Sequence, residues 1–475
     1  MSLQEYLDQI IDQNIIEKIL NPNKESFPLG DFDNYKEIPI EWTKNININD
    51  FEKTYLNIGR FEKYIFIGMG GSISMARIAS FINPSKIEFI DNFDISTIKN
   101  TKEILNNPST AIFICSKSRN TLETAILDQI ITTNKINKFY IQDDLKDKKN
   151  ILATPKQTGG RFSISTHLGI LPFYLAGFNL DKIIANINKA NKDCKSNQYN
   201  NPAIKIAAIL FHNYKKNKKL FSIYSQNEND YIADWIEQLI SESTGKEENG
   251  ILPIKDINTI YPLISFSSNE DLFTDTKINL KIDYSESLFY KFQILMYAIS
   301  IFCSLIDIQP FDQPNVESTK ITTKSLLETK NIDDTSFLDK ANLSALVKEI
   351  KENKGIISLL IHGTNIDIEQ KKNLIKSTSK ISSEDQRVLI FFAPNYLHSM
   401  GQLLKGSFKN IQNLVINLHG NEDLNIPNSL YTLNTFVKKQ GYSDHLELIK
   451  NERKSLYFET NYEELMKNLN NLIND

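Results

Sequence analysis

Tyr64-Ile-Phe-Ile-Gly-Met-Gly-Gly-Ser72 predicts the fold class of this 475-residue chain. A short apolar run ends in glycines and leads into a helical pattern, which is the order of a buried strand, a tight turn and a helix. Comparable apolar runs follow at 87–90, 111–115, 138–142, 220–224, 355–361, 388–392 and 414–418. Because short strands that alternate with helices are typical of parallel sheets, we predict an α/β protein of doubly wound parallel sheets.

The length of the chain predicts two or three domains. We expect residues 1–195 to form an N-terminal helix and a first domain, and residues 196–426 a second domain with the candidate catalytic helices. Residues 427–475 would be a C-terminal appendage. A stretch rich in Asn and Lys at 188–201 is the expected linker.

Two segments outside the strands have helical patterns. Apolar residues at helical spacing from Leu3 to Leu20 predict an amphipathic N-terminal helix. The run from Phe292 to Ile306 is shorter than the ~20 residues of a membrane span, so we expect a buried core helix. The N-terminus lacks the basic and apolar regions of a signal peptide.

The composition argues against some partners and against a protein-built metal site. The net charge is -4, from 54 basic and 58 acidic residues, which argues against nucleic acid and acidic membranes as partners. The three cysteines have no CxxC spacing, which fits a reducing cytoplasm. The six histidines show no HExxH pattern, so we expect no transition-metal site built from protein ligands.

Two glycine- or hydroxyl-rich turns follow predicted strands. In the first turn, Gly71 and Ser72 lie where backbone N–H groups and a helix N-terminus can face an anion, although a plain tight turn is the alternative. It is not a dinucleotide fingerprint, because Ile73 stands where a third glycine would be needed. The second turn, at 115–124, could be a helix cap, but its hydroxyl and basic groups favour a phosphate site. They are Ser116, Lys117, Ser118 and Thr121.

Three side chains are candidates for proton-transfer chemistry. Arg161 follows two glycines and can offer a fixed cation to a developing oxyanion; a solvated arginine on a turn is the alternative. On the helix predicted from Tyr231 to Glu242, Gln238 and Glu242 are four residues apart and lie on the same polar face. Glu242 could be a general base, although a lone glutamate is usually a solvated helix residue.

A second helix and a late histidine complete the candidates. Pro314 suits the first position of a helix. Gln313 and Lys320 are seven residues apart, two helical turns, and so share a face; a capped helix with an exposed lysine is the alternative. His398 can exchange a proton near neutral pH, and a structural histidine is the alternative.

Five motifs, GxGGS, SKSxxTxET, GGRxS, ESTGK and FDQPxVExxK, occur in this order, and together they resemble the glucose-6-phosphate isomerase family. The resemblance extends from about Tyr64 to Glu459. Residues 396–406 and 426–432 resemble most the isomerase half of transaldolase/phosphoglucose isomerase fusion proteins, in which the histidine motif also comes late. The resemblance implies two sugar-isomerase (SIS-type) domains, a homodimer, and cofactor-free interconversion of glucose 6-phosphate and fructose 6-phosphate through a cis-enediol.

The resemblance also implies roles for single residues. Glu242 would move the proton between C2 and C1, Arg161 would stabilise the enediolate, and Lys320 with His398 would serve ring opening. Gln238 and Gln313 would orient the substrate. The expected phosphate ligands are Gly71, Ser72, Ser116, Lys117, Ser118 and Thr121.

Three other functions are open to such a chain. An isomerase acting on mannose 6-phosphate, alone or in addition, would use the same residues. A non-catalytic sugar-phosphate sensor is possible on this fold, but it would not need Glu242, Lys320 and His398 together. A transaldolase would need an eight-fold barrel, and the sequence offers no such repeat.

Overall fold

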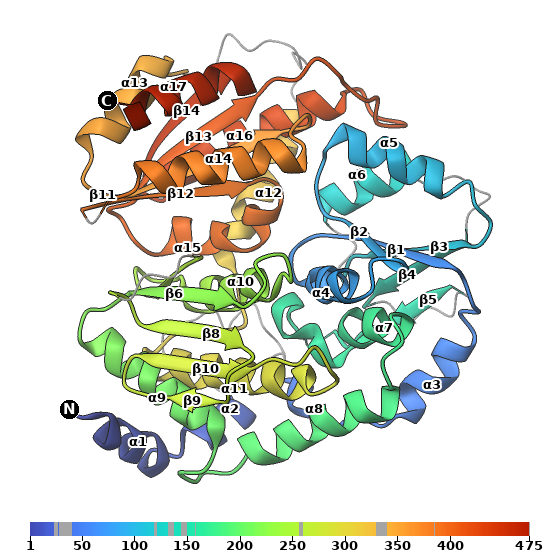
Figure 1. The fold of residues 1–475 in the computed structure, drawn as a ribbon, viewed down its shortest axis with the longest axis vertical. Coiled ribbons are helices and arrows are strands. Elements are labelled where there is room, and N and C mark those ends of the chain that lie inside the picture. The colour runs from blue at the N-terminus through green and yellow to red at the C-terminus, as the bar shows by residue number, and fades with distance from the viewer. Residues whose placement is uncertain are drawn as a thin grey trace. The chain divides into compact units, whose positions relative to one another are not determined.

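The computed structural model describes most of the chain (Figure 1). The described residues are 1–22, 27, 40–117, 121–131, 137–143, 150–156, 158–255, 260–328, 340–383 and 385–474. Contacts divide the chain into two units. Unit 1 comprises residues 1–90, 107–124 and 135–313, and unit 2 comprises residues 91–106, 125–134 and 314–475.

The first sheet of unit 1 is parallel, with the strand order β2-β1-β3-β4-β5. Its strands are β1 (Lys63–Gly68), β2 (Ile87–Ile90), β3 (Thr110–Cys115), β4 (Asn137–Gln142) and β5 (Ile151–Ala153). Phe66, Phe113 and Phe139 are in register on β1, β3 and β4, and their rings stack with centroids 4.8 and 5.1 Å apart. This aromatic row fixes the pairing of the three central strands.

Helices and short 3-10 turns accompany this sheet. They are η1 (Glu41–Thr43), α3 (Asn49–Leu56), η2 (Gly70–Ser72), α4 (Ser74–Ile82), η3 (Gly160–Ser165) and α7 (His167–Leu175). Helix α6 (Leu122–Ile131) follows β3 along the chain, and its residues from 125 onward belong to unit 2. Gly169 of α7 lies so close to η3 that an added Cβ would come 2.0 Å from the Ile164 carbonyl oxygen. The absence of a side chain at Gly169 thus allows η3 to pack closely against α7.

The second sheet of unit 1 has the order β7-β6-β8-β10-β9, and only β9 is antiparallel to its neighbour. Its strands are β6 (Leu220–Ser225), β7 (Leu252–Ile254), β8 (Leu263–Ser267), β9 (Leu272–Phe273) and β10 (Lys277–Lys281). Its helices are α8 (Leu180–Cys194), α9 (Pro202–Lys215), α10 (Ile232–Thr244) and α11 (Leu288–Leu305). One continuous apolar core joins both sheets of unit 1.

Helix α11 is the expected core helix. It is long and apolar enough to cross a membrane by length and composition alone, yet 83% of its apolar window is buried inside the structure. It packs against α8 and α9. Burial within a protein core accounts for its hydropathy.

The expected N-terminal helix is two helices, α1 (Leu3–Asp12) and α2 (Ile15–Leu20). Ser2 and Glu5 form a capping box that starts α1. Between the helices Asn14 adopts a left-handed conformation with φ 47°, which interrupts the helix. The prediction of one continuous helix was therefore wrong in the middle, because apolar spacing alone does not reveal this break.

Unit 2 holds a parallel sheet of order β12-β11-β13-β14. Its strands are β11 (Gly355–Gly363), β12 (Gln386–Phe392), β13 (Gln412–Leu418) and β14 (Lys454–Thr460). Helices α13 (Leu343–Glu352), α14 (Ile368–Ile381) and α17 (Tyr462–Asn474) share one apolar core with it. Helix α16 (Leu433–Lys450) lies on the opposite face, where Gly441 meets His362 of β11 (Figure 1). The remaining elements are α5 (Ile95–Ile104), α12 (Pro314–Glu328), η5 (Asn395–His398) and α15 (Met400–Gly406).

The structure divides the chain at other points than those expected. The expected boundary at 195 and 196 falls inside unit 1, between α8 and α9, because both helices pack on α11. The expected linker begins within α8, where Asn191 is buried and its side chain donates to the Lys44 carbonyl. The expected appendage supplies β14, which pairs with β13 and so completes a sheet.

Candidate active site

The strand order of the first sheet reverses direction between β1 and β3, and ligands of open α/β sheets bind outside the carboxyl ends of strands at such a point. Gly68 and Cys115, the last residues of the two strands, are paired in register. The turn η2, with Gly71 and Ser72, follows β1, and Ser116 follows β3. The two expected phosphate loops therefore start side by side.

Two hydroxyls at this edge are buried without a hydrogen-bond partner in the described part of the chain. They are Ser116 Oγ and Thr158 Oγ1, the latter on the loop after β5. Buried hydroxyls are normally paired, so these two are available to a ligand. Thr121 is half-buried nearby in sequence, and Ser118 lies outside the described residues.

Lys117, an expected phosphate ligand, contacts protein groups. Its Nζ donates to the Lys156 carbonyl at 2.7 Å and lies 3.8 Å from Asp143 Oδ2. Burial lowers the pKa of Lys117, an effect that Asp143 opposes, and burial also raises the pKa of Asp143. Its role as a phosphate ligand stays a prediction.

Gly71 brings the first and third motifs together. A Cβ on Gly71 would lie 2.2 to 2.5 Å from backbone atoms of Gly160 and Arg161, so only glycine fits. Ser163 Oγ donates to the Gly160 carbonyl at 2.6 Å, which tightens η3 at the same place. The glycine of GxGGS therefore determines where the backbone of Arg161 lies.

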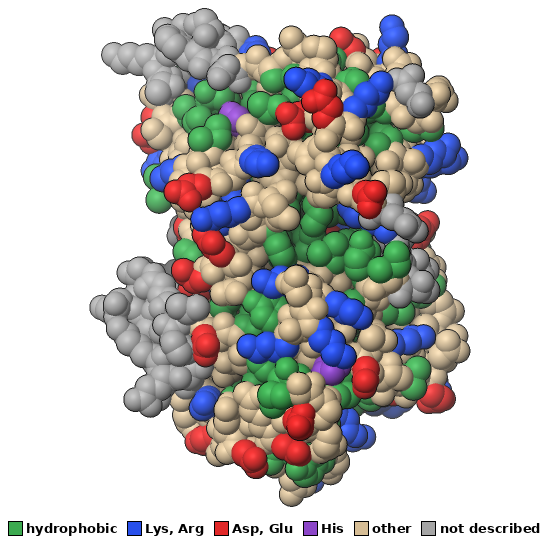
Figure 2. Space-filling model, turned by 90° about the vertical axis from the view of Figure 1, so that its left-hand side faces the viewer, with side chains coloured by type: hydrophobic (Ala, Val, Ile, Leu, Met, Phe, Trp, Pro, Cys, Tyr) green, Lys and Arg blue, Asp and Glu red, His purple; other side chains and the backbone are tan. Residues whose placement is uncertain are grey.

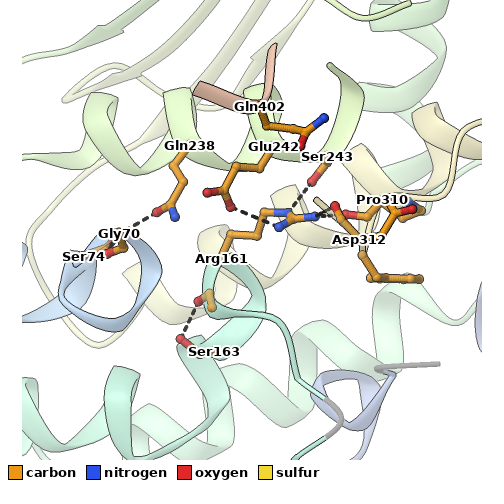
Figure 3. Close-up of polar contacts among 12 residues, drawn as sticks. Gly70, Ser74, Arg161, Ser163, Gln238, Glu242, Ser243, Pro310, Asp312 and Gln402 are labelled. Atoms are coloured by element: carbon orange, nitrogen blue, oxygen red, sulfur yellow. Dashed lines mark hydrogen bonds and ion pairs between the residues drawn. The ribbon is translucent and has the colours of Figure 1, made fainter. Parts of the chain in front are cut away.

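Arg161 is the most fully bonded side chain of the site (Figure 3). It is 1% exposed. Nε donates to Ser243 Oγ at 3.0 Å and Nη1 to Glu242 Oε2 at 3.0 Å. Nη2 donates to the carbonyls of Pro310 and, at 3.0 Å, Asp312. All three nitrogens are thus used, and the guanidinium has a single orientation.

Helix α10 carries the other two expected residues. It continues two residues beyond Glu242, so the carboxylate lies in the last turn, and Glu242 and Gln238 are both buried. Gln238 Oε1 accepts a hydrogen bond from Ser74 Oγ at 3.2 Å, and Ser74 also contacts the Gly70 carbonyl at 3.0 Å (Figure 3). Arg161 compensates the charge of the buried Glu242 carboxylate.

The expected roles did not include an ion pair beside this site. Lys246 Nζ lies 2.5 Å from Asp312 Oδ1, and both side chains are buried. Lys246 belongs to ESTGK and Asp312 to FDQ, so their motifs were visible in the sequence although their pairing was not. Gln313 follows Asp312 and is half-buried.

Lys320 and His398 belong to unit 2. Lys320 Nζ pairs with Glu317 Oε1 at 2.7 Å on α12, and His398 is half-buried at the end of η5. The first turn of α12 contacts α15: Asn315 N donates to Gln402 Oε1 at 3.0 Å, and Gln402 Nε2 donates to Asn315 Oδ1 at 2.7 Å. Helix α12, which carries Lys320, is thus bonded to α15, the helix that follows the His398 turn η5. The action of Lys320 and His398 with Glu242 stays a prediction.

A buried network holds the turn before His398. Tyr396 donates to Asp444 Oδ2 at 2.5 Å and contacts His362 Nε2 at 2.7 Å. Asp444 also pairs with Lys405. Burial lowers the pKa of His362 to about 4. The network gives the η5 turn a fixed support inside unit 2.

Neither metal-binding side chains nor the surface in Figure 2 indicate a second site in the described part of the chain. Among these residues no cluster of three His, Cys, Asp or Glu could hold a metal ion. On the face drawn in Figure 2, basic and acidic side chains of the described residues are interspersed.

Solved structures share the fold. A hypothetical protein TT0462 from Thermus thermophilus aligns with a TM-score of 0.56 and 18% identity, over 69% of this chain and 97% of that one. A glucose-6-phosphate isomerase from Chlamydia trachomatis aligns with a TM-score of 0.53 and 12% identity, over 74% and 89%. The protein is therefore an α/β protein with parallel sheets whose fold resembles these two structures, which confirms the predicted fold class.

The sequence relatives indicate a family more specifically than the structural neighbours do. The glucose-6-phosphate isomerase of Methanocaldococcus jannaschii is 35% identical over 224 residues, 43% of this chain and 55% of the relative. That of Mycoplasmopsis pulmonis is 30% identical, over 53% and 65%, and that of Fusobacterium nucleatum 27% identical, over 57% and 81%. The chain is thus similar to bacterial and archaeal glucose-6-phosphate isomerases.

No family model matches the chain. The matched stretch spans 55 to 65% of the length of the first curated relatives.

Proposed function

We propose that this protein is a glucose-6-phosphate isomerase, which interconverts glucose 6-phosphate and fructose 6-phosphate through a cis-enediol. The observation that carries the proposal is the buried contact between Arg161 Nη1 and Glu242 Oε2. It places a fixed cation next to a candidate base, in the unit that also holds the two candidate phosphate loops. The sequence relatives named above support the same reaction.

The phosphate of the substrate would bind at the carboxyl ends of β1 and β3. The backbone N–H of Gly71 and the N-terminus of the following helix α4 suit an anion. The Ser72 N–H donates to the Met69 carbonyl at 3.2 Å, so Ser72 would act through its hydroxyl. Ser116 supplies an unpaired buried hydroxyl, and Lys117, Ser118 and Thr121 come from the same loop.

The proton transfer would be the work of Glu242. On the open-chain aldose, its carboxylate takes the C2 proton, and the electron pair of that bond moves towards C1 and its oxygen to form the enediolate. Glu242 returns the proton to C1 while the O2 proton passes to O1, which leaves a ketone at C2. Arg161 offsets the developing negative charge, and Gln238 and Gln313 orient the hydroxyl groups.

Ring opening would fall to Lys320 on α12 and His398 on η5, and α12 is hydrogen-bonded to α15, the helix that follows η5. The late histidine motif is the reason why we place the chain next to the isomerase half of transaldolase/phosphoglucose isomerase fusion proteins. No cofactor is needed for this chemistry. A cytoplasmic homodimer remains our expectation.

The function is tested with purified protein and fructose 6-phosphate, with glucose 6-phosphate detected by a coupled dehydrogenase, in the presence and absence of EDTA. We expect turnover that EDTA does not reduce. Fructose 6-phosphate binding without turnover would contradict the proposal and favour a sensor. Preferred turnover of mannose 6-phosphate under the same conditions would reassign the substrate.

A further inference from the structure

Lys246 and Asp312 form an ion pair that the proposed chemistry does not use. The side chains are 4% and 5% exposed, and Nζ lies 2.5 Å from both Asp312 Oδ1 and the Gln309 carbonyl oxygen. Burial lowers the pKa of Lys246, and Asp312 opposes this effect. The attraction between two buried ions often fails to offset the free energy of removing both from water. Two well-packed apolar residues in their place often stabilise a fold equally well or better. Such a pair therefore suggests a role other than stability.

The loop at 309–312 is fixed from both sides. Gln309 Oε1 accepts hydrogen bonds from the backbone N–H groups of Phe311, at 3.0 Å, and Asp312, at 2.7 Å. Lys246 binds the loop through the Gln309 carbonyl and the Asp312 side chain. Arg161 binds the loop through the Pro310 and Asp312 carbonyls. The loop thus lies between two cations.

The contacts of Arg161 show what this loop does for the site. Nη2 uses the two loop carbonyls, and Nη1 reaches Glu242 from the same planar group. Because a guanidinium is rigid, a shift of the carbonyls that hold Nη2 also shifts Nη1. The orientation of Arg161 towards Glu242 therefore depends on the position of the 309–312 loop.

We propose that Lys246 and Asp312 are positioning residues, which hold the 309–312 loop so that its carbonyls orient Arg161 towards Glu242 and the reacting carbons. The inference rests on the proposed isomerase function. Neither residue needs to touch the substrate. The pair acts on proton transfer, the step in which negative charge develops. The phosphate loops after β1 and β3 are separate segments of the chain, so the pair does not act on phosphate binding.

The test separates positioning from stability with a double variant, Lys246→Met/Asp312→Asn. Each single change leaves a buried charge unpaired and is expected to lower Tm, whereas the double change removes both charges. We expect the double variant to keep a Tm near that of the wild type. Since misplacing a catalytic group by about 1 Å can cost on the order of 10²-fold, we expect kcat to fall roughly 10- to 100-fold with little change in KM.

The matched control is Lys255→Met/Glu237→Gln. These residues form another pair in unit 1, with Nζ 3.0 Å from Oε2, and Glu237 is also on α10. The control should keep the wild-type kcat. A double variant at Lys246 and Asp312 that also keeps the wild-type kcat overturns the inference. If that double variant does not fold, Lys246→Arg retains the charge but not the compact ammonium, and its kcat should fall with KM unchanged; a wild-type kcat there overturns the inference too.

A crystal structure of the double variant gives a readout that needs no activity. We expect Arg161 to lose the Pro310 or the Asp312 carbonyl as a partner. Unchanged contacts would overturn the inference. If the wild-type protein does not isomerise fructose 6-phosphate, the proposed function fails, and this structure still decides whether the pair positions Arg161.

Discussion

Arg161 Nη1 donates a hydrogen bond to Glu242 Oε2 over 3.0 Å, and both side chains are buried within unit 1. The two residues are 81 positions apart in sequence and come from η3 and α10. Each compensates the charge of the other in a place where an unpaired charge would be costly. A substrate bound at this pair would meet a carboxylate and a cation that are already oriented, which is the arrangement that an enediolate needs.

Replacement of the candidate base is expected to abolish most turnover. Glu242→Gln keeps the shape and the position on α10 but cannot accept a proton, and general bases typically contribute about 10² to 10⁴-fold. Steady-state assays with fructose 6-phosphate should show that loss in kcat. Glu237→Gln, a buried glutamate of the same helix, should retain the wild-type rate. Equal rates for the two variants would contradict the assignment.

Arg161→Lys is expected to lower kcat on the order of 10²-fold or more, because one ammonium cannot replace three nitrogens that serve four partners. The measurement is kcat, with Tm as a check of folding. Arg77→Lys is the control, because Arg77 binds Asp234 on α10 and has no role in the proposed chemistry. A folded Arg161→Lys protein with full activity would show that a guanidinium is not required at this position.

Gly71→Ala is expected to disturb both stability and activity. The new Cβ would lie 2.2 to 2.5 Å from backbone atoms of Gly160 and Arg161, so either η2 or η3, which carries Arg161, has to shift. Thermal unfolding and kcat measure the two effects. In Gly159→Ala the nearest atom to the new Cβ is 3.7 Å away, so this variant should behave as the wild type. A harmless Gly71→Ala would mean that η2 and η3 need not be in contact.

His167 is expected to make the stability of unit 1 depend on pH. Burial lowers its pKa from 6.5 to about 4, so as the pH falls the unfolded chain binds the proton first. The stabilising contribution is therefore present above pH 6.5 and is lost as the pH falls towards 4. Between pH 7 and pH 5 the loss amounts to about 2 kcal/mol.

Urea unfolding of the wild type and of His167→Phe at both pH values measures this contribution. The phenylalanine keeps an aromatic ring beside Phe51, where the ring centroids are now 4.8 Å apart, and it cannot titrate. The wild type should lose about 2 kcal/mol more than the variant on acidification. Equal losses would show that His167 titrates alike in the folded and unfolded chain.

The strands were predictable from the sequence, because each expected run is short, apolar and followed by a turn signal. The run at 87–90 is β2 with the same bounds, and the other expected runs lie within observed strands. Pro314 is the first residue of α12, as its preference for a helix start predicts. The strands β5, β7 to β10 and β14 were not predicted.

The division of the chain was less predictable, because it depends on long-range packing. Asn191 lies in an Asn-rich stretch that suggests a linker, yet its side chain accepts a hydrogen bond from Gln293 of α11 at 2.7 Å. Local composition contains no trace of such a partner. The same limit explains why the motifs of Lys246 and Asp312 were visible but their ion pair was not.

The most direct test of the central claim follows deuterium from solvent into the product. Wild-type protein and Glu242→Gln are incubated with fructose 6-phosphate in D₂O, and NMR measures glucose 6-phosphate and the deuterium at its C2. We predict that the wild type forms product with deuterium at C2, because the proton held by Glu242 exchanges with solvent, and that Glu242→Gln loses turnover and exchange together. Turnover and exchange at the wild-type rate in Glu242→Gln would contradict the claim that Glu242 carries the proton.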